Sequence, residues 1–275
     1  MTAESDRRWL QVGEFVADFG GNELDHAALL AGRTLRLNFE DGTTEQYRFG
    51  QNDELSATGA KDSGSPLTLD VNYRATQLRP GIVLVDFIDP KSRIRSVSTV
   101  LDLQHGVCTQ LIGLLPQREQ TLIPLFTRVQ KKQSLSAVEV KIRRGVIDAP
   151  FSPAAALHAP TDELVGRRVY HEYGPHDAYE HIYLESDLYS WHCIKGPEVG
   201  LADTDRCYVY KLDADLYLFA WIEKIIPTLG VVMMDSAALR TTGKIFGYQG
   251  DDFGATVNSP VGAVSRLVNV TQYER

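Results

Sequence analysis

Apolar and polar side chains alternate over short stretches of the chain, which is the two-residue period of half-buried β-strands. In residues 33–40, Leu35, Leu37 and Phe39 fall on one face, and an Asp41-Gly42 hairpin signal follows. The same pattern predicts further strands at 43–49, 67–73, 81–88, 95–101, 168–173, 179–184, 189–194, 206–212, 217–224, 231–235 and 244–248. The pattern therefore predicts a mostly β protein.

Helical periodicity is scarce. The best case is Glu23–Leu30, with Thr161–Leu164 as its counterpart later in the chain. Many short antiparallel strands are typical of sandwiches and barrels, and a barrel of about eight strands leaves room for one small ligand. We therefore expect antiparallel barrels, with a closing or edge strand near residues 138–142.

The chain repeats itself at a constant spacing of 134 residues, as in Leu30 and Leu164. The matching segments include Gly32-Arg33 and Gly166-Arg167, Val83–Asp89 and Tyr217–Glu223, and Gly113 and Gly247. Between the copies, residues 149–163 hold three prolines and many small side chains, which do not sustain a long element. This predicts a first barrel in residues 1–148, a linker in 149–163 and a second barrel in 164–275.

The 275 residues carry a net charge of -8. That sign disfavours nucleic acid and anionic membranes as partners. The N-terminal sequence has no apolar targeting segment, no stretch is long enough to span a bilayer, and the three cysteines lack metal or redox spacing. We expect a cytoplasmic protein with reduced thiols, and we leave open whether it forms a homodimer.

Reactive side chains are concentrated in the second copy. His171 and Tyr173 stand where the first copy has Leu37 and Phe39. This predicts an apolar, degenerate pocket in the first barrel and a polar, aromatic pocket in the second. Further candidates for ligand contacts are Trp221, Phe219, Trp191, Tyr183, His181, Tyr208 and Tyr210.

In each copy a strand ends in an acid two residues after a bulky side chain: Asp89 follows Phe87, and Glu223 follows Trp221. Residues two apart share a strand face, so Glu223 is expected on an aromatic face, where burial raises a carboxyl pKa. The alternative is a solvated strand-end acid, or one paired with Lys224. Two histidines and an acid could also ligate zinc, but their spacing is not that of a local ligand set, so we expect no metal and no cofactor.

Several long blocks of sequence resemble the MoaF family. They are Tyr179–Leu184, Tyr189–Gly196, Leu216–Gly230 and Arg240–Gly247. The resemblance covers nearly the whole chain and implies tandem calycin-like (lipocalin-like) barrels.

The second half is also distantly similar to phenolic acid decarboxylases, which are small barrels without a cofactor. Phe219, Trp221 and Glu223 match a strand of that family, and the following Pro227-Thr-Leu-Gly230 matches with a displacement. The resemblance implies that Glu223 takes the position of the catalytic glutamate. It also places Tyr173 at one substrate-binding tyrosine, His171 at the other, and His192 at an arginine.

The leading hypothesis is a cofactor-independent lyase, isomerase or cyclase that acts on a small hydrophobic or aromatic compound. Glu223 would be the general acid/base, His192 a second proton donor, and Tyr173 and His171 the orienting groups. The competing hypothesis is a carrier that binds an aromatic or amine ligand without chemistry. A purely structural module is the third alternative, and it leaves the polar aromatic cluster unexplained.

Overall fold

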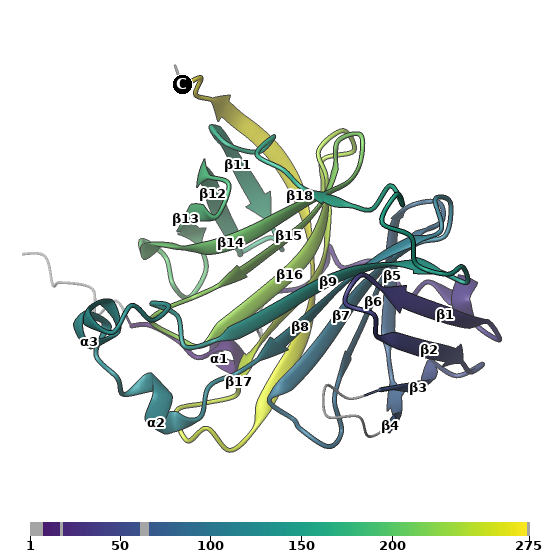
Figure 1. The fold of residues 1–275 in the computed structure, drawn as a ribbon. Coiled ribbons are helices and arrows are strands. Elements are labelled where there is room, and N and C mark those ends of the chain that lie inside the picture. Colours follow the sequence, from purple (N-terminus) through teal and green to yellow (C-terminus); the bar gives the residue numbers. More distant parts are fainter. Residues whose placement is uncertain (1–7, 17–18, 61–65, 274–275) are drawn as a thin grey trace, which may run out of the picture.

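The computed structural model describes residues 8–16, 19–60 and 66–273. They form two nine-stranded antiparallel sheets, each curled into a barrel, that lie side by side (Figure 1). The predicted mostly β fold of two tandem antiparallel barrels is thereby confirmed. None of the helices in the described part of the chain is long and apolar enough to cross a membrane.

The first sheet contains β1 (Thr34–Phe39), β2 (Thr44–Phe49), β3 (Glu54–Ala60), β4 (Pro66–Asn72), β5 (Arg74–Arg79), β6 (Ile82–Ile88), β7 (Arg95–Asp102), β8 (Val107–Leu114) and β9 (Glu139–Ile147). The second contains β10 (Ala159–Pro160), β11 (Arg167–Glu172), β12 (Ala178–Glu185), β13 (Leu188–Lys195), β14 (Ala202–Asp213), β15 (Leu216–Ile222), β16 (Thr228–Asp235), β17 (Arg240–Tyr248) and β18 (Thr256–Val270). Alternation did not predict β3, β5, β8, β10 and β18.

The first hairpin shows how the sequence sets the local structure. Leu35, Leu37 and Phe39 on β1 are all buried, as their spacing predicts. Gly42 adopts a φ of 83°, which suits a residue without a Cβ, and the Asp41 carboxylate accepts from the amide of Thr43 at 3.0 Å.

The predicted helices are largely absent. Of Glu23–Leu30 only a 3-10 turn, η2 (Ala28–Leu30), forms, because the preceding residues extend along β5 and the amide of Ala27 bonds to the carbonyl of Ala75 at 2.9 Å. Thr161–Leu164 is a turn rather than a helix, and the amide of Thr161 bonds to the carbonyl of Val209. Within the described ranges, the α-helices are the short α1 (Val12–Phe15), α2 (Arg118–Thr121) and α3 (Leu125–Gln130).

The barrels pack against each other through the outer faces of β6–β8 and β15–β17, which together enclose a third hydrophobic core. The core is made by residues of both copies, among them Leu84, Val100, Leu111, Leu218, Val231 and Phe246. Arg79 of the first barrel links the two barrels at the edge of this core, because its guanidinium donates to Asp235 at 2.6 Å and to Asp213 at 3.2 Å. The two barrels are therefore one packed unit.

The N-terminal segment crosses from the first barrel to the second. We call residues 8–16 and 19–20 the plug. Its helix α1 lies beside β17 (Figure 1), and Val12 rests on Gly247, where any Cβ would overlap it. The side chains of Val12, Phe15, Val16 and Phe19 belong to the core of the second barrel.

Candidate functional site

A small aromatic cavity lies inside the second barrel, beneath the plug. Its volume is about 30 Å³, enough for about one or two water molecules. It is lined by Phe15, Phe19, Tyr173, Tyr179, His181, Tyr189, Trp191, Glu198, Trp221, Glu223 and Ile245. Strands β12, β13, β15 and β17 supply most of its wall.

Glu223 is held at the rim of this cavity by Trp221. Residue 221 points inward from β15, and its indole Nε1 donates to Glu223 Oε1 at 3.0 Å. Opposite, on β16, Gly230 pairs with Trp221, and a Cβ there would overlap the indole ring. The glycine thus gives the tryptophan the room to lie flat and present its N–H to the carboxylate.

Two more buried carboxyl groups flank Glu223. Glu198 accepts from the hydroxyl of Tyr179 at 3.0 Å. Asp205 accepts from the indole of Trp191 at 3.0 Å and from the backbone amide of Lys224 at 3.1 Å. The cavity therefore concentrates acidic groups among aromatic rings.

This environment favours the protonated form of Glu223. Burial, and then the negative charges of Asp205 and Glu198, raise its pKa well above the usual value, while the bond from Trp221 lowers it. Burial also raises the pKa of Glu198 and of Asp205, although Lys224 opposes the shift at Asp205. A raised pKa favours the protonated carboxyl group, which is the form that can donate a proton.

The equivalent acid of the first copy is in a different environment. Asp89 forms an ion pair with Arg95 at 3.1 Å and accepts from the amide of Lys91 at 2.9 Å. No ion pair with Glu223 is found among the described residues. The interior of the first barrel has the expected apolar side chains, but it also holds a buried ion pair between Arg143 and Glu45 that the sequence did not reveal.

Two neutral histidines lie deeper in the second barrel. The rings of His171 and His181 are 4.6 Å apart, and burial lowers both pKa values, that of His171 to about 4. His171 Nδ1 lies 2.9 Å from the hydroxyl of Ser265. His171 Nε2 and His181 Nδ1 are buried without a hydrogen-bond partner. These nitrogens are available to a polar group that enters the barrel.

The plug closes the mouth of the cavity with aromatic rings. Phe19 stacks on Tyr173 at 4.8 Å and meets Tyr179 edge-on at 5.7 Å. Trp9 packs edge-on against Trp191 at 5.7 Å. The rings of the plug therefore fill the space that an aromatic ligand would take.

The structure brings together only some of the candidate residues. Glu223, Tyr173, Trp221, Trp191 and His181 line the cavity. Deeper in the barrel, His171 and Tyr183 line a separate cavity of about 60 Å³, and Phe219 stacks behind Trp221 at 5.4 Å.

The structure does not bring His192, Tyr208 or Tyr210 to this cavity. His192 alternates with the inward-facing Trp191 and Cys193, so it lies half-buried on the opposite face of β13. Tyr208 and Tyr210 pack against the core between the barrels. The strand alternation that places their neighbours inside places these three side chains outside.

Comparison with known proteins agrees with this two-barrel organisation. Residues 7–117 match the MoaF N-terminal domain, and residues 158–271 match the MoaF C-terminal domain. A protein named Protein MoaF from Klebsiella aerogenes is 40% identical over 275 residues, covering 98% of this chain and 99% of that protein. The chain belongs to the MoaF family.

Among solved structures, a candidate β-lactamase from Burkholderia vietnamiensis is 18% identical, with a TM-score of 0.33. The match covers 38% of this chain and 95% of that one. A similarity of this size supports no assignment of function to the MoaF-family chain.

Sequence reasoning missed several residues of the site in this MoaF-family protein. Asp205 shares a face of β14 with the buried Cys207 and Val209, a signal that could have placed it inside. Glu198 follows β13 in a turn that folds back over the cavity, and no periodic pattern marks such a turn. No group of three or more metal-ligating side chains is found in residues 8–16, 19–60 and 66–273.

Proposed function

We propose that this protein is a cofactor-independent acid–base catalyst, a lyase, isomerase or cyclase, whose site is the cavity of the second barrel. The observation that carries the proposal is Glu223, an acid at the rim of an aromatic cavity, without an ion-pair partner among the described residues and with a raised pKa. A carboxyl group with a raised pKa is suited to act as a general acid, and as a general base after it has lost its proton.

The neighbouring residues have distinct roles in this proposal. Protonated Glu223 delivers a proton to the bound compound, and the indole N–H of Trp221 stabilises the carboxylate that remains. Burial raises the pKa of Glu223, and the negative charge of Asp205, held by Trp191 and Lys224, raises it further. Glu198 is the second group that can take up or return a proton.

A small hydrophobic or aromatic compound suits the walls of the cavity. The stacking of Phe19 on Tyr173 supports this choice, because it is a contact that an aromatic ligand would reproduce after the plug moves aside. The proposal requires this movement, since the closed cavity holds only water-sized molecules.

A carrier without chemistry is the second candidate. It is favoured by the unpartnered nitrogens of His171 and His181, which suit retention of a polar ligand by hydrogen bonds alone. In a carrier, Glu223 would bond a ligand amine or hydroxyl and would transfer no proton.

Replacement of Glu223 by Gln separates the two functions. The protein is incubated with panels of aromatic acids, amines and lactones, and mass spectrometry identifies retained and altered compounds. A catalyst loses product formation in Glu223→Gln by at least about a hundredfold and still retains the compound. Asp89→Asn, at the equivalent position of the first copy, is the matched control and keeps turnover. A carrier shows retained compounds, no product with the wild type, and weaker retention with Glu223→Gln.

A further inference from the structure

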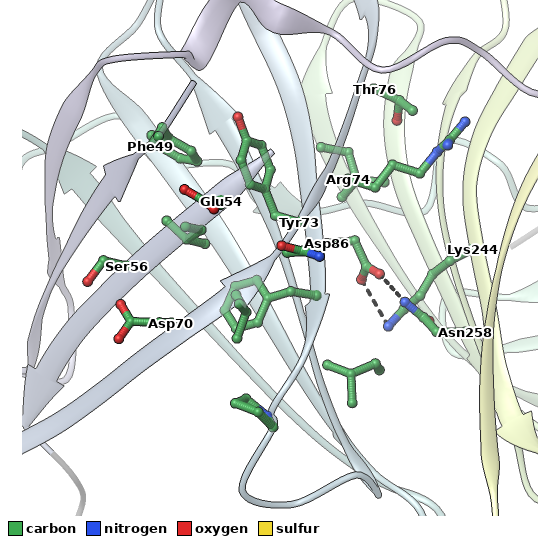
Figure 2. A pocket seen from close by; sticks show the side chains of 18 of the residues that line it. Phe49, Glu54, Ser56, Asp70, Tyr73, Arg74, Thr76, Asp86, Lys244 and Asn258 are labelled. Atoms are coloured by element: carbon green, nitrogen blue, oxygen red, sulfur yellow. Dashed lines mark hydrogen bonds and ion pairs between the residues drawn. The ribbon is translucent and has the colours of Figure 1, made fainter. Parts of the chain in front are cut away.

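A much larger cavity lies between the two barrels. Its volume is about 990 Å³, and Figure 2 shows the side chains around it. The first barrel contributes residues of β2–β6, and the second contributes Gly243, Lys244, Asn258 and Pro260. It shares no lining residue with the cavity around Glu223.

The cavity exists because one wall of the first barrel is left open. In the second copy, the single strand β14 pairs with both β13 and β15, and Lys224 closes the remaining gap by donating to Asp205 and to the carbonyl of Thr204. In the first copy, this strand is split into β4 and β5, which pair with β3 and β6 respectively. Pro90 stands at the position of Lys224 and has neither an amide hydrogen nor a charge to offer.

The opening between β4 and β6, which we call the window, is bounded at both ends by hydrogen bonds. At one end, β5 and β6 pair at Arg74 and Asp86. At the other end, the ammonium of Lys91 donates to the carbonyl of Thr68 at 2.9 Å. Between these ends the apolar interior of the first barrel faces the cavity, with Phe49, Leu55, Val71, Tyr73 and Phe87 among its lining residues.

A polar cluster joins the two barrels along one side of the cavity (Figure 2). Asp86 accepts from Lys244 Nζ at 2.9 Å, from the hydroxyl of Ser98 at 2.6 Å and from Asn258 Nδ2 at 2.5 Å. Lys244, only 2% exposed, also donates to the hydroxyl of Ser96. An ammonium has three hydrogens, so one remains after these two bonds. The Oδ1 atom of Asn258 is buried without a hydrogen-bond partner.

The charges of the lining indicate what the cavity can accept. Three cationic side chains (Arg48, Arg74 and Lys244) are matched by three anionic ones (Glu54, Asp70 and Asp86). Lys244 and Asp86 form an ion pair, so a molecule bound beside them meets no unpaired charge. A hydroxyl or carbonyl oxygen can accept the remaining hydrogen of Lys244, and a hydroxyl can also donate to Asn258.

We propose that this interdomain cavity is a second ligand-binding site, which takes an uncharged, largely apolar molecule carrying a hydroxyl or carbonyl oxygen. The apolar body lies in the window of the first barrel, and the oxygen faces Lys244 and Asn258. The site is independent of the acid–base function proposed for the second barrel.

Two dyes test the site. Nile red is uncharged and carries a ring carbonyl, whereas diphenylhexatriene is a hydrocarbon without oxygen. The wild type is expected to bind one Nile red per chain with saturable fluorescence. Val71→Trp, which fills the window, should weaken the affinity for Nile red at least tenfold. Ile112→Trp is the matched control, because Ile112 is a half-buried residue of the same core that does not line the cavity.

Lys244→Met tests the polar contact. This substitution should weaken the affinity for Nile red about tenfold and leave the affinity for diphenylhexatriene unchanged. Thermal unfolding is measured alongside to detect loss of folding. Unsaturable dye binding, or equal affinity of the two tryptophan variants, would overturn the site. Equal losses for the two dyes would overturn the contact with Lys244. Glu223→Gln should bind Nile red like the wild type, so failure of this proposal is distinguishable from failure of the proposed catalysis.

Discussion

The plug makes a sharp prediction for Phe19→Ala. Phe19 is 7% exposed and touches the rings of Tyr173, Tyr179 and Phe15. Loss of a buried phenyl ring costs about 2–3 kcal/mol of transfer free energy, and lost ring contacts add about 0.5–1.5 kcal/mol. We therefore expect a loss of about 3 kcal/mol in the free energy of unfolding, in line with core phenylalanine deletions.

The same substitution opens a ring-sized space above the cavity. Indole should then bind and restore stability. At ten times its Kd, a ligand adds about 1.4 kcal/mol. For a chain of this size, the substitution corresponds to a fall in Tm of roughly 6–12 °C, and indole should recover roughly 3–6 °C of it.

Thermal unfolding with and without indole is the assay, and it needs no knowledge of the natural ligand. Phe253→Ala is the control, because Phe253 packs on Tyr248 at 4.5 Å, outside the second barrel's cavity. Indole should not stabilise this variant more than the wild type. If Phe19→Ala gains no more from indole than Phe253→Ala does, the plug is not filling a ring site and the reasoning is wrong.

Three further predictions concern the acidic cluster and its support. The raised pKa of Glu223 contributes stability that is fully present below the unfolded pKa of about 4.5 and is lost as pH rises through the folded pKa. The free energy of unfolding in urea should therefore decline between pH 5 and 9 in the wild type and decline less in Glu223→Gln. Asp205→Asn removes a neighbouring negative charge and should lower the pKa of Glu223, which would move the pH–rate profile to lower pH; an unchanged profile would contradict the coupling. Gly230→Ala should lower stability by about 1–3 kcal/mol in urea unfolding, because its Cβ overlaps Trp221; a neutral effect would show that the indole can move away at no cost.

The period of a strand fixes which side chains share a face, and that part of the structure could be predicted. Leu35, Leu37 and Phe39 face the first core as their spacing requires. The same rule shows why Trp191 and His192 cannot line one cavity, since adjacent strand residues point to opposite faces. The resemblance to another family placed His192 at an arginine, and this implied position conflicted with the alternation.

Other features depend on contacts between distant segments and leave no periodic signal. Phe15 and Phe19 stand four apart, as on a helix, but nothing in that spacing says that they close the barrel of the second copy. Glu198 reaches its place through a turn that folds back over the cavity. The window of the first barrel exists because Pro90 cannot form the hydrogen bonds that Lys224 forms at the equivalent position of the second copy. Only a comparison of the two structures at these positions shows this difference.

The packing of the plug against β17 has a consequence for the order of folding during synthesis. The plug has its binding surface on strands that are made more than 200 residues later, as the contact between Val12 and Gly247 shows. Domains generally fold as they emerge, so the first barrel can close before the residues that Trp9 and Phe15 contact have been synthesised. The plug is thus synthesised before the first barrel, yet it can dock only after the strands of the second barrel have formed.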